Sequence, residues 1–423
     1  MKSLRVLSIA LGVFACASWS VCGEEPARSP QYENTDAGQT IAAASADEEK
    51  ITFSARKADA YLKNGALYWW AEKGCVTCHT NGIYGVERPS LTPVLGKPEA
   101  EVRSHFVAQI DDFHKLAGDE RKDLHGGVRP TQVAVITRGL VEWDKHVTGR
   151  LSDESKKALS LMFELQAPDG SWANIDCWPP YESSVFQGAT VAVMAAATAR
   201  GWLDEIASEE ERAKYQKAVS YLRTTDPGHD YERLLRLWTA TRVPSLLSDD
   251  EKQAFIEVVW KQQNEDGGWS MLDFYTFENW SAASRPRGFL TKAEFDDPPS
   301  DGHMTGLALL VLIDSGVDIK DKRIERGVEW LLANQRESGR WWTRSLNTDN
   351  YHFMTYSATA YALIALHKAG RLKKATGESD DAGNAGPVRF SEHLLAGNFG
   401  YVFGVAAADL DGDGDLDKPR HSR

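Results

Sequence analysis

The chain has 423 residues, of which 42% are hydrophobic, and its formal net charge at pH 7 is −13. This composition excludes a mostly disordered chain and a protein with many membrane spans. The acidic balance argues against nucleic acid as a partner, because phosphate backbones are bound by basic surfaces.

Residues 1–17 are typical of an export signal. They begin with the basic residues Lys2 and Arg5 and continue with an apolar run that is too short for a membrane span of about 20 residues. Small residues around Cys16 fit the cleavage rule of secretory signals. We therefore predict an exported protein, periplasmic or extracellular, without a transmembrane helix; a lipid anchor on Cys16 is the alternative. The polar residues 18–52 are predicted to form a flexible spacer.

The next segment, residues 53–149, is predicted to form helical hairpins, and it carries the motif with the most specific chemistry. Two residues separate Cys75 from Cys78, and His79 follows directly. C-x-x-C-H is the attachment pattern of c-type haem, in which both thiols bind the macrocycle and the imidazole binds the iron. The motif predicts covalent haem c in a protein of electron transfer or redox chemistry, with a redox partner protein. Export agrees with this prediction, because it leads to the side of the membrane where c-type haem is normally attached.

The same three residues allow other interpretations. The cysteines could form a simple disulfide, or half of a zinc site with no second Cys/His pair nearby, or a thioredoxin-like motif, which the lack of a βαβ pattern disfavours. The sixth ligand of a haem iron also stays open, because no Met occurs between His79 and Met162. Four histidines fall in this interval: His105, His114, His125 and His146.

A repeated motif, Q-x-x-x-G-x-W, organises residues 150–372. It occurs at Gln166–Trp172, Gln263–Trp269 and Gln335–Trp341. Each copy follows an amphipathic helical pattern and precedes a helical pattern that is apolar nearly all round. The Gln amide is expected to bond free backbone groups at a helix end, and the Trp to cover the loop. With degenerate copies, the pattern predicts about six helical hairpins that bury their faces by stacking.

These loops resemble the QW repeats of the squalene–hopene cyclase and prenyltransferase group. The resemblance implies an all-α fold, an α/α toroid in which inner helices are ringed by outer helices. It does not bring the activity with it, because the D-x-D-D acid motif of the cyclases is absent from the sequence. Residue types of the prenyltransferase zinc site are present in Asp176, Cys177, His303 and His352. The local pattern around them does not match that site. A toroid enzyme of this group, or a non-catalytic module that binds a polysaccharide or a protein, remains an alternative to the haem protein.

The end of the chain has a different character. A linker is expected at 373–387, and residues 388–423 resemble part of an FG-GAP/VCBS repeat, a short β-type fragment with an acidic calcium loop. Carboxylates stand at alternate positions, as calcium ligands do in such loops: Asp409, Asp411, Asp413, Asp415 and Asp417. Arg420 occupies the position of the closing Glu of a full EF-hand, so a solvated acidic tail is the alternative to a calcium site.

Overall fold

The computed structural model describes residues 47–174, 184–281, 290–346 and 353–372. All of them belong to the first of two compact units, residues 1–375; the second unit is 376–423. The predicted signal, most of the spacer, the linker and the calcium loop with its five Asp residues therefore lie outside the described residues. Within the described part, no helix is both long and apolar enough to cross a membrane.

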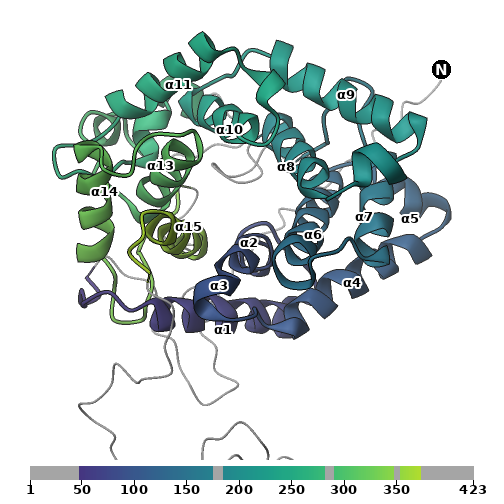
Figure 1. Ribbon diagram of the computed structural model, residues 1–423, viewed down its shortest axis with the longest axis horizontal. Helices are drawn as coiled ribbons and strands as arrows, with labels where there is room; N and C mark the ends of the chain where they lie inside the picture. Colours follow the sequence, from purple (N-terminus) through teal and green to yellow (C-terminus); the bar gives the residue numbers. More distant parts are fainter. Residues whose placement is uncertain (1–46, 175–183, 282–289, 347–352, 373–423) are drawn as a thin grey trace, which may run out of the picture. The chain divides into compact units, whose positions relative to one another are not determined.

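Helices of the first unit form two concentric layers (Figure 1). The inner layer consists of α2 (Asn81–Glu87), α6 (Arg129–Trp143), α8 (Val185–Thr198), α10 (Asp230–Ala240), α13 (Gly302–Asp314) and α15 (Met354–Lys368). The outer layer consists of α1 (Ala55–Lys73), α4 (Ala100–Lys115), α7 (Asp153–Glu164), α9 (Glu209–Thr224), α11 (Asp249–Lys261) and α14 (Lys322–Ala333). Short helices lie in the connections: α3 (Thr92–Leu95), α5 (Gly118–Asp123) and α12 (Phe277–Ser281).

The inner layer closes on itself. Each inner helix contacts the next one in chain order, and α15 contacts α2. The described residues thus contain six outer–inner pairs arranged in a ring, and the predicted fold class, an all-α toroid of about six hairpins, is confirmed (Figure 1). The predicted β-type fragment is not among the described residues.

The inner helices are buried almost all round because their sequences are apolar and rich in small residues. Residues 302–312 of α13 are all buried. A side chain at Gly306 would come within 2.7 Å of the backbone nitrogen of Ala362, so α13 and α15 can approach this closely only because glycine stands there.

The tryptophans of the three Q-x-x-x-G-x-W motifs have a structural role, as the sequence predicted. Each indole nitrogen donates a hydrogen bond of 2.8 Å to the carbonyl oxygen ten residues earlier, in its own outer helix. The three rings, Trp172, Trp269 and Trp341, are at most 1% exposed. Each indole therefore covers the end of its outer helix and satisfies one of the free carbonyl groups there.

The glutamines of the motif join each hairpin to the next outer helix. Gln263 donates to the carbonyl of Gly267 in its own loop (2.8 Å) and to that of Arg323 in α14 (2.9 Å). Gln166 does the same with Gly170 and with Lys214 of α9. The motif glycines have positive φ, and a Cβ at Gly267 would lie 2.8 Å from a backbone oxygen of α14. The close approach of loop and helix requires glycine at this position.

The third copy of the motif closes the ring. The Gln335 amide donates to the carbonyl of Ser54, the N-cap of α1, and its oxygen accepts from the Ser54 backbone nitrogen (2.9 and 2.6 Å). The segment before α1 adds a second link, since the carboxylate of Glu48 pairs with the fully buried Arg340 at 2.9 Å. The beginning and the end of the helical ring are therefore held together by polar contacts that are largely shielded from water.

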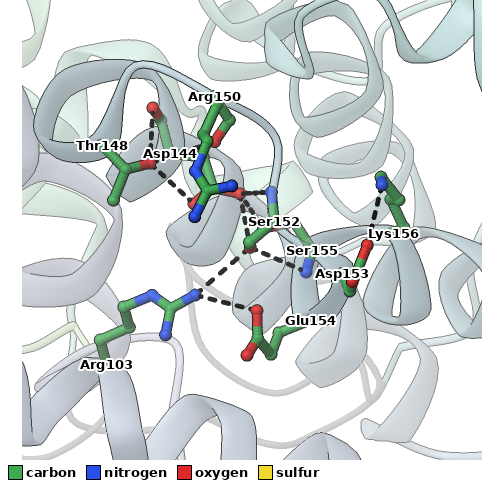
Figure 2. A network of polar contacts seen from close by, with 9 residues as sticks. All are labelled: Arg103, Asp144, Thr148, Arg150, Ser152, Asp153, Glu154, Ser155 and Lys156. Carbon is green, nitrogen blue, oxygen red and sulfur yellow. Dashed lines mark hydrogen bonds and ion pairs between the residues drawn. The ribbon is translucent and has the colours of Figure 1, made fainter.

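A buried carboxylate joins the second and third hairpins (Figure 2). Asp144 is 2% exposed and begins a π-helical segment after α6. It accepts hydrogen bonds from the backbone and hydroxyl of Ser152, the N-cap of α7, and from the Ser155 hydroxyl at 2.6–2.7 Å. Arg103 of α4 reaches the same Ser152 hydroxyl at 3.3 Å, so three elements meet at one polar junction.

Replacing Gln335 by Leu tests the closure of the ring. The variant loses three hydrogen bonds and leaves buried backbone groups without partners, which should lower the free energy of unfolding by about 2–3 kcal/mol. Urea denaturation followed by circular dichroism measures the effect. The exposed Gln253, whose amide contacts only the side chain of Glu257, supplies the matched Gln→Leu control. Equal stability losses in the two variants would contradict the assigned role of Gln335.

Candidate functional site

The C-x-x-C-H sequence forms the turn between α1 and α2, the place where other hairpins carry the Q-x-x-x-G-x-W loop. Gly74 ends α1 in the left-handed conformation. Val76, between the cysteines, points into the core and is 1% exposed. Its backbone nitrogen donates to the side chain of Gln109 in α4, at 3.3 Å, and its carbonyl accepts from Gln132 of α6. The turn is thus tied to the second hairpin through both of its layers.

Asn81 holds the turn from inside. Its side chain is fully buried, accepts from the backbone nitrogen of Thr77 at 2.9 Å and donates to the carbonyl of Cys75 at 3.0 Å. A Cβ at Gly82 would lie 1.9 Å from the Thr77 oxygen, so only glycine permits this packing. The conformation of the motif is therefore fixed by side chains of the folded ring.

Cys75 and Cys78 do not form a disulfide with each other in the structure, and both are partly exposed. The structure therefore does not have the disulfide that the sequence allowed. It also offers no second half for a zinc site: among the described residues, no group of three or more His, Cys, Asp or Glu side chains could hold a metal ion. Thioether attachment to a macrocycle requires two cysteines that are not joined in a disulfide and that lie within reach of the macrocycle.

His79 is held as a neutral, oriented imidazole. The residue is 8% exposed, and its ring stacks on Phe353 at 4.4 Å and meets the edge of Trp69 at 4.8 Å. Burial lowers the pKa of His79 to about 3, so the ring carries no charge at neutral pH. Its Nδ1 lies 2.7 Å from the hydroxyl oxygen of the buried Thr80. If Nδ1 donates this bond, Nε2 presents its lone pair, as a metal-binding histidine must.

The donor set fits haem c. The two cysteines are partly exposed and not joined in a disulfide, the imidazole has one nitrogen engaged by its neighbour, and aromatic rings stand beside it. Trp69 touches His79, whereas its neighbour Trp70 stacks on His105 at 4.3 Å. Tyr84 of α2 accepts a hydrogen bond from the backbone of Glu99 and so supports the start of the second hairpin. Phe353 comes from the last hairpin, and no sequence signal pointed to it.

Two of the histidines considered as sixth ligands have other partners. His105 is stacked on Trp70 and lies 3.5 Å from Glu101. His146 lies 3.4 Å from the buried Glu142. Neither arrangement brings the histidine to His79, so the structure does not select a sixth ligand between them.

Ion pairs occupy the inner side of the ring. Arg138 of α6 pairs with Glu87 of α2 at 3.1 Å and lies over the ring of Trp238 from α10 at 4.7 Å. Glu142 pairs with Arg242 at 2.7 Å. Burial raises the pKa of the Glu87 carboxyl, and the neighbouring Arg138 opposes this rise. Residues of three inner helices thus meet in a polar cluster that is largely shielded from water.

A second buried group lies at the start of α13. His303 is 0% exposed; its Nδ1 lies 2.7 Å from the Ser357 hydroxyl, and its Nε2 lies 3.3 Å from the Tyr231 hydroxyl. Both ring nitrogens are therefore engaged by side chains of neighbouring inner helices. The other residues of the prenyltransferase-like zinc set, Asp176, Cys177 and His352, lie outside the described residues.

No protein-family model matches the chain, and no curated protein matches it. Solved structures do show a likeness. The type II terpene cyclase MstE from Scytonema is 14% identical with a TM-score of 0.37, covering 75% of this chain and 100% of that one. A glycosidase solved in complex with glucose is 10% identical with a TM-score of 0.43, covering 76% and 100%. Both likenesses concern the helical fold alone, and neither protein's activity is transferred to this chain.

The buried His303 predicts a pH dependence of stability. Burial lowers its pKa from 6.5 to about 3 in the folded chain. As the pH falls below 6.5, only the unfolded chain takes up this proton, so the free energy of unfolding falls. The contribution of this group between pH 7 and pH 5 is about 2 kcal/mol. Urea titrations of the wild type and the non-titrating His303→Asn variant at both pH values measure it.

The variant should be less sensitive to acid than the wild type, whatever its stability at pH 7. The carboxyls of Asp273 and Asp301 have raised pKa values and favour folding at low pH, but they are present in both proteins. A stability difference that is the same at the two pH values would show that His303 does not stay neutral in the folded chain.

Proposed function

We propose that this chain is an exported c-type haem protein that acts in electron transfer or redox chemistry. Cys75 and Cys78 would hold the macrocycle through thioether bonds, and His79 would be an axial ligand of the iron. The observation that carries the proposal is the buried His79, whose Nδ1 lies 2.7 Å from the Thr80 hydroxyl, directly after the partly exposed Cys75 and Cys78, which do not form a disulfide with each other. Bound haem would supply an iron centre that takes up and releases one electron.

The residues of the chain have separate tasks in this proposal. Asn81 and Gln132 hold the turn in the shape that presents the two thiols. In this proposal Nδ1 of His79 donates to the Thr80 hydroxyl, so that the lone pair of Nε2 would be available to the iron. Phe353 and Trp69 cover the imidazole and keep water away from it. A low local dielectric strengthens each of these polar contacts.

A cyclase of the QW-repeat group is the less favoured function. A hydrocarbon substrate would need an apolar cavity inside the ring, and the acid motif of the cyclases is absent from the sequence. The described inner side instead brings together the charged side chains of Glu87, Arg138 and Glu142. Two cysteines directly before a histidine have no task in polyene cyclisation, whereas haem attachment uses all three residues.

Haem attachment is tested by producing the full chain together with a c-type maturation system. The purified protein should give a pyridine haemochrome spectrum of c type and a mass increase of one haem. Cys75→Ala with Cys78→Ala should remove the covalent haem entirely, because no thiol of the motif remains. Cys177→Ser is the matched control and should keep it. A protein without haem absorbance, or one that keeps covalent haem in the double variant, would end the proposal.

Thr80 allows a finer test. Thr80→Val removes the acceptor of the His79 Nδ1 hydrogen bond while keeping the shape of the side chain. The imidazole then becomes a weaker electron donor, so the reduction potential of the bound haem should rise. Spectroelectrochemical titration measures the potential. Thr77→Val serves as control, since only the backbone of Thr77 is bonded to Asn81. A potential that does not change at Thr80→Val would show that this hydroxyl does not act on the imidazole.

A further inference from the structure

A cavity of about 480 Å³ lies between the loops that follow α11 and α14, in the fifth and sixth hairpins. It shares no residue with the C-x-x-C-H turn. Its volume is in the range of sites that bind small molecules. Its lining includes both apolar side chains and charged side chains of both signs.

Part of the lining is apolar and rigid. Trp341 is fixed by its indole hydrogen bond to Leu331 and is 1% exposed, whereas Trp342 beside it is partly exposed. Leu272 is 8% exposed. Trp330 also lines the cavity, and its indole nitrogen donates to Asp266 at 2.8 Å, which fixes the orientation of the ring. A ligand would therefore meet flat aromatic surface that is ordered before binding.

The polar part of the lining contains charges of both signs. Glu294 and Arg344 form an ion pair at 2.7 Å, and both side chains are about one-third exposed. Asp301 is the N-cap of α13 and accepts from the backbone nitrogens of Met304 and Met271 at 2.9 and 2.7 Å. Asp297 and Arg336 complete the set, giving three carboxylates and two guanidinium groups. Desolvation raises the pKa of the half-buried Asp301 to about 6.

We propose that this cavity binds a neutral, polyhydroxylated ring, that is, a sugar unit of a saccharide. The proposal goes beyond the haem function and does not depend on it.

The charges of the lining disfavour organic cations and anions as ligands. An organic cation is attracted by the carboxylates and the indoles but repelled by Arg336 and Arg344. An anion is attracted by the two guanidinium groups but repelled by the carboxylates of Asp297 and Asp301. Carboxylates only accept hydrogen bonds and guanidinium groups only donate them, whereas a hydroxyl group does both. A ring whose edge carries hydroxyls can therefore satisfy both kinds of group, while its C–H face packs on an indole.

Isothermal titration calorimetry of the purified full chain at pH 7 tests the proposal. The probes are glucose, N-acetylglucosamine, cellobiose and chitobiose, with choline chloride and sodium acetate as charged comparison ligands. At least one saccharide should bind saturably with a stoichiometry of one, and neither charged ligand should. Binding of choline or acetate without a saccharide, or no binding by any probe, would overturn the assignment.

Two variants locate the binding in the cavity. Trp342→Ala and Arg344→Met should each weaken saccharide binding by about tenfold or more. Trp143→Ala, at a partly buried tryptophan of the second hairpin outside the cavity, is the matched control and should bind as the wild type does. Thermal melts show that each variant is folded. Equal affinities in Trp342→Ala and Trp143→Ala would place the binding elsewhere and overturn the proposal.

The haem proposal and the saccharide proposal can fail separately. The variant that combines Cys75→Ala with Cys78→Ala should bind the saccharide with unchanged affinity, because no residue of the motif lines the cavity. Loss of saccharide binding in that variant would contradict the independence of the two sites.

Discussion

The ring depends on one recurring contact, the hydrogen bonds that the motif glutamines donate to the next outer helix. In the third hairpin this contact reaches α9, in the fifth α14, and in the sixth the N-cap of α1. Stacked hairpins could otherwise continue as an open superhelix, because hydrophobic stacking alone does not specify where the array ends. Gln335 and Ser54 give the sixth hairpin the same contact to the first that other hairpins have to their successors, and the array is thereby closed.

The first hairpin lacks this loop and has the C-x-x-C-H turn in its place. Its connection to the second hairpin is made in another way, through Gln109 of α4 and Gln132 of α6. The motif glutamines donate from the loop to a backbone carbonyl of the next outer helix. At α4 the roles are exchanged: the turn supplies the backbone N–H donor, and Gln109 of the outer helix supplies the side-chain acceptor. A turn that carries both the link between hairpins and the candidate haem ligands is held rigidly, which suits a centre whose geometry must not relax between redox states.

Much of the helical ring could be predicted from the sequence, because the sequence features that specify it lie close together in the chain. The periodicity of the helices, the motif spacing and the role of Trp172 and its equivalents all follow from residues close together in the chain. The candidate site could be predicted only in its covalent part. Phe353 lies 274 positions beyond His79, and nothing local marks it as the residue that stacks on the imidazole. The same holds for Gln132, whose role appears only when α6 packs beside the turn.

The paired charges on the inner side of the ring explain why both candidate sites lie in loops. The contact between α2 and α6 is surrounded by charged side chains that pair with one another: Arg138 lies close to both Glu87 and Glu142. Taking one of these charges away from its partner costs several kcal/mol, roughly the range measured for broken buried ion pairs. A ligand that displaced them would have to compensate for that cost, whereas the Glu294–Arg344 pair at the loop cavity is about one-third exposed and costs less to separate. The C-x-x-C-H turn and the cavity beside Trp342 both lie in such loops, so the chemistry of this toroid is expected in its connections and not in its centre.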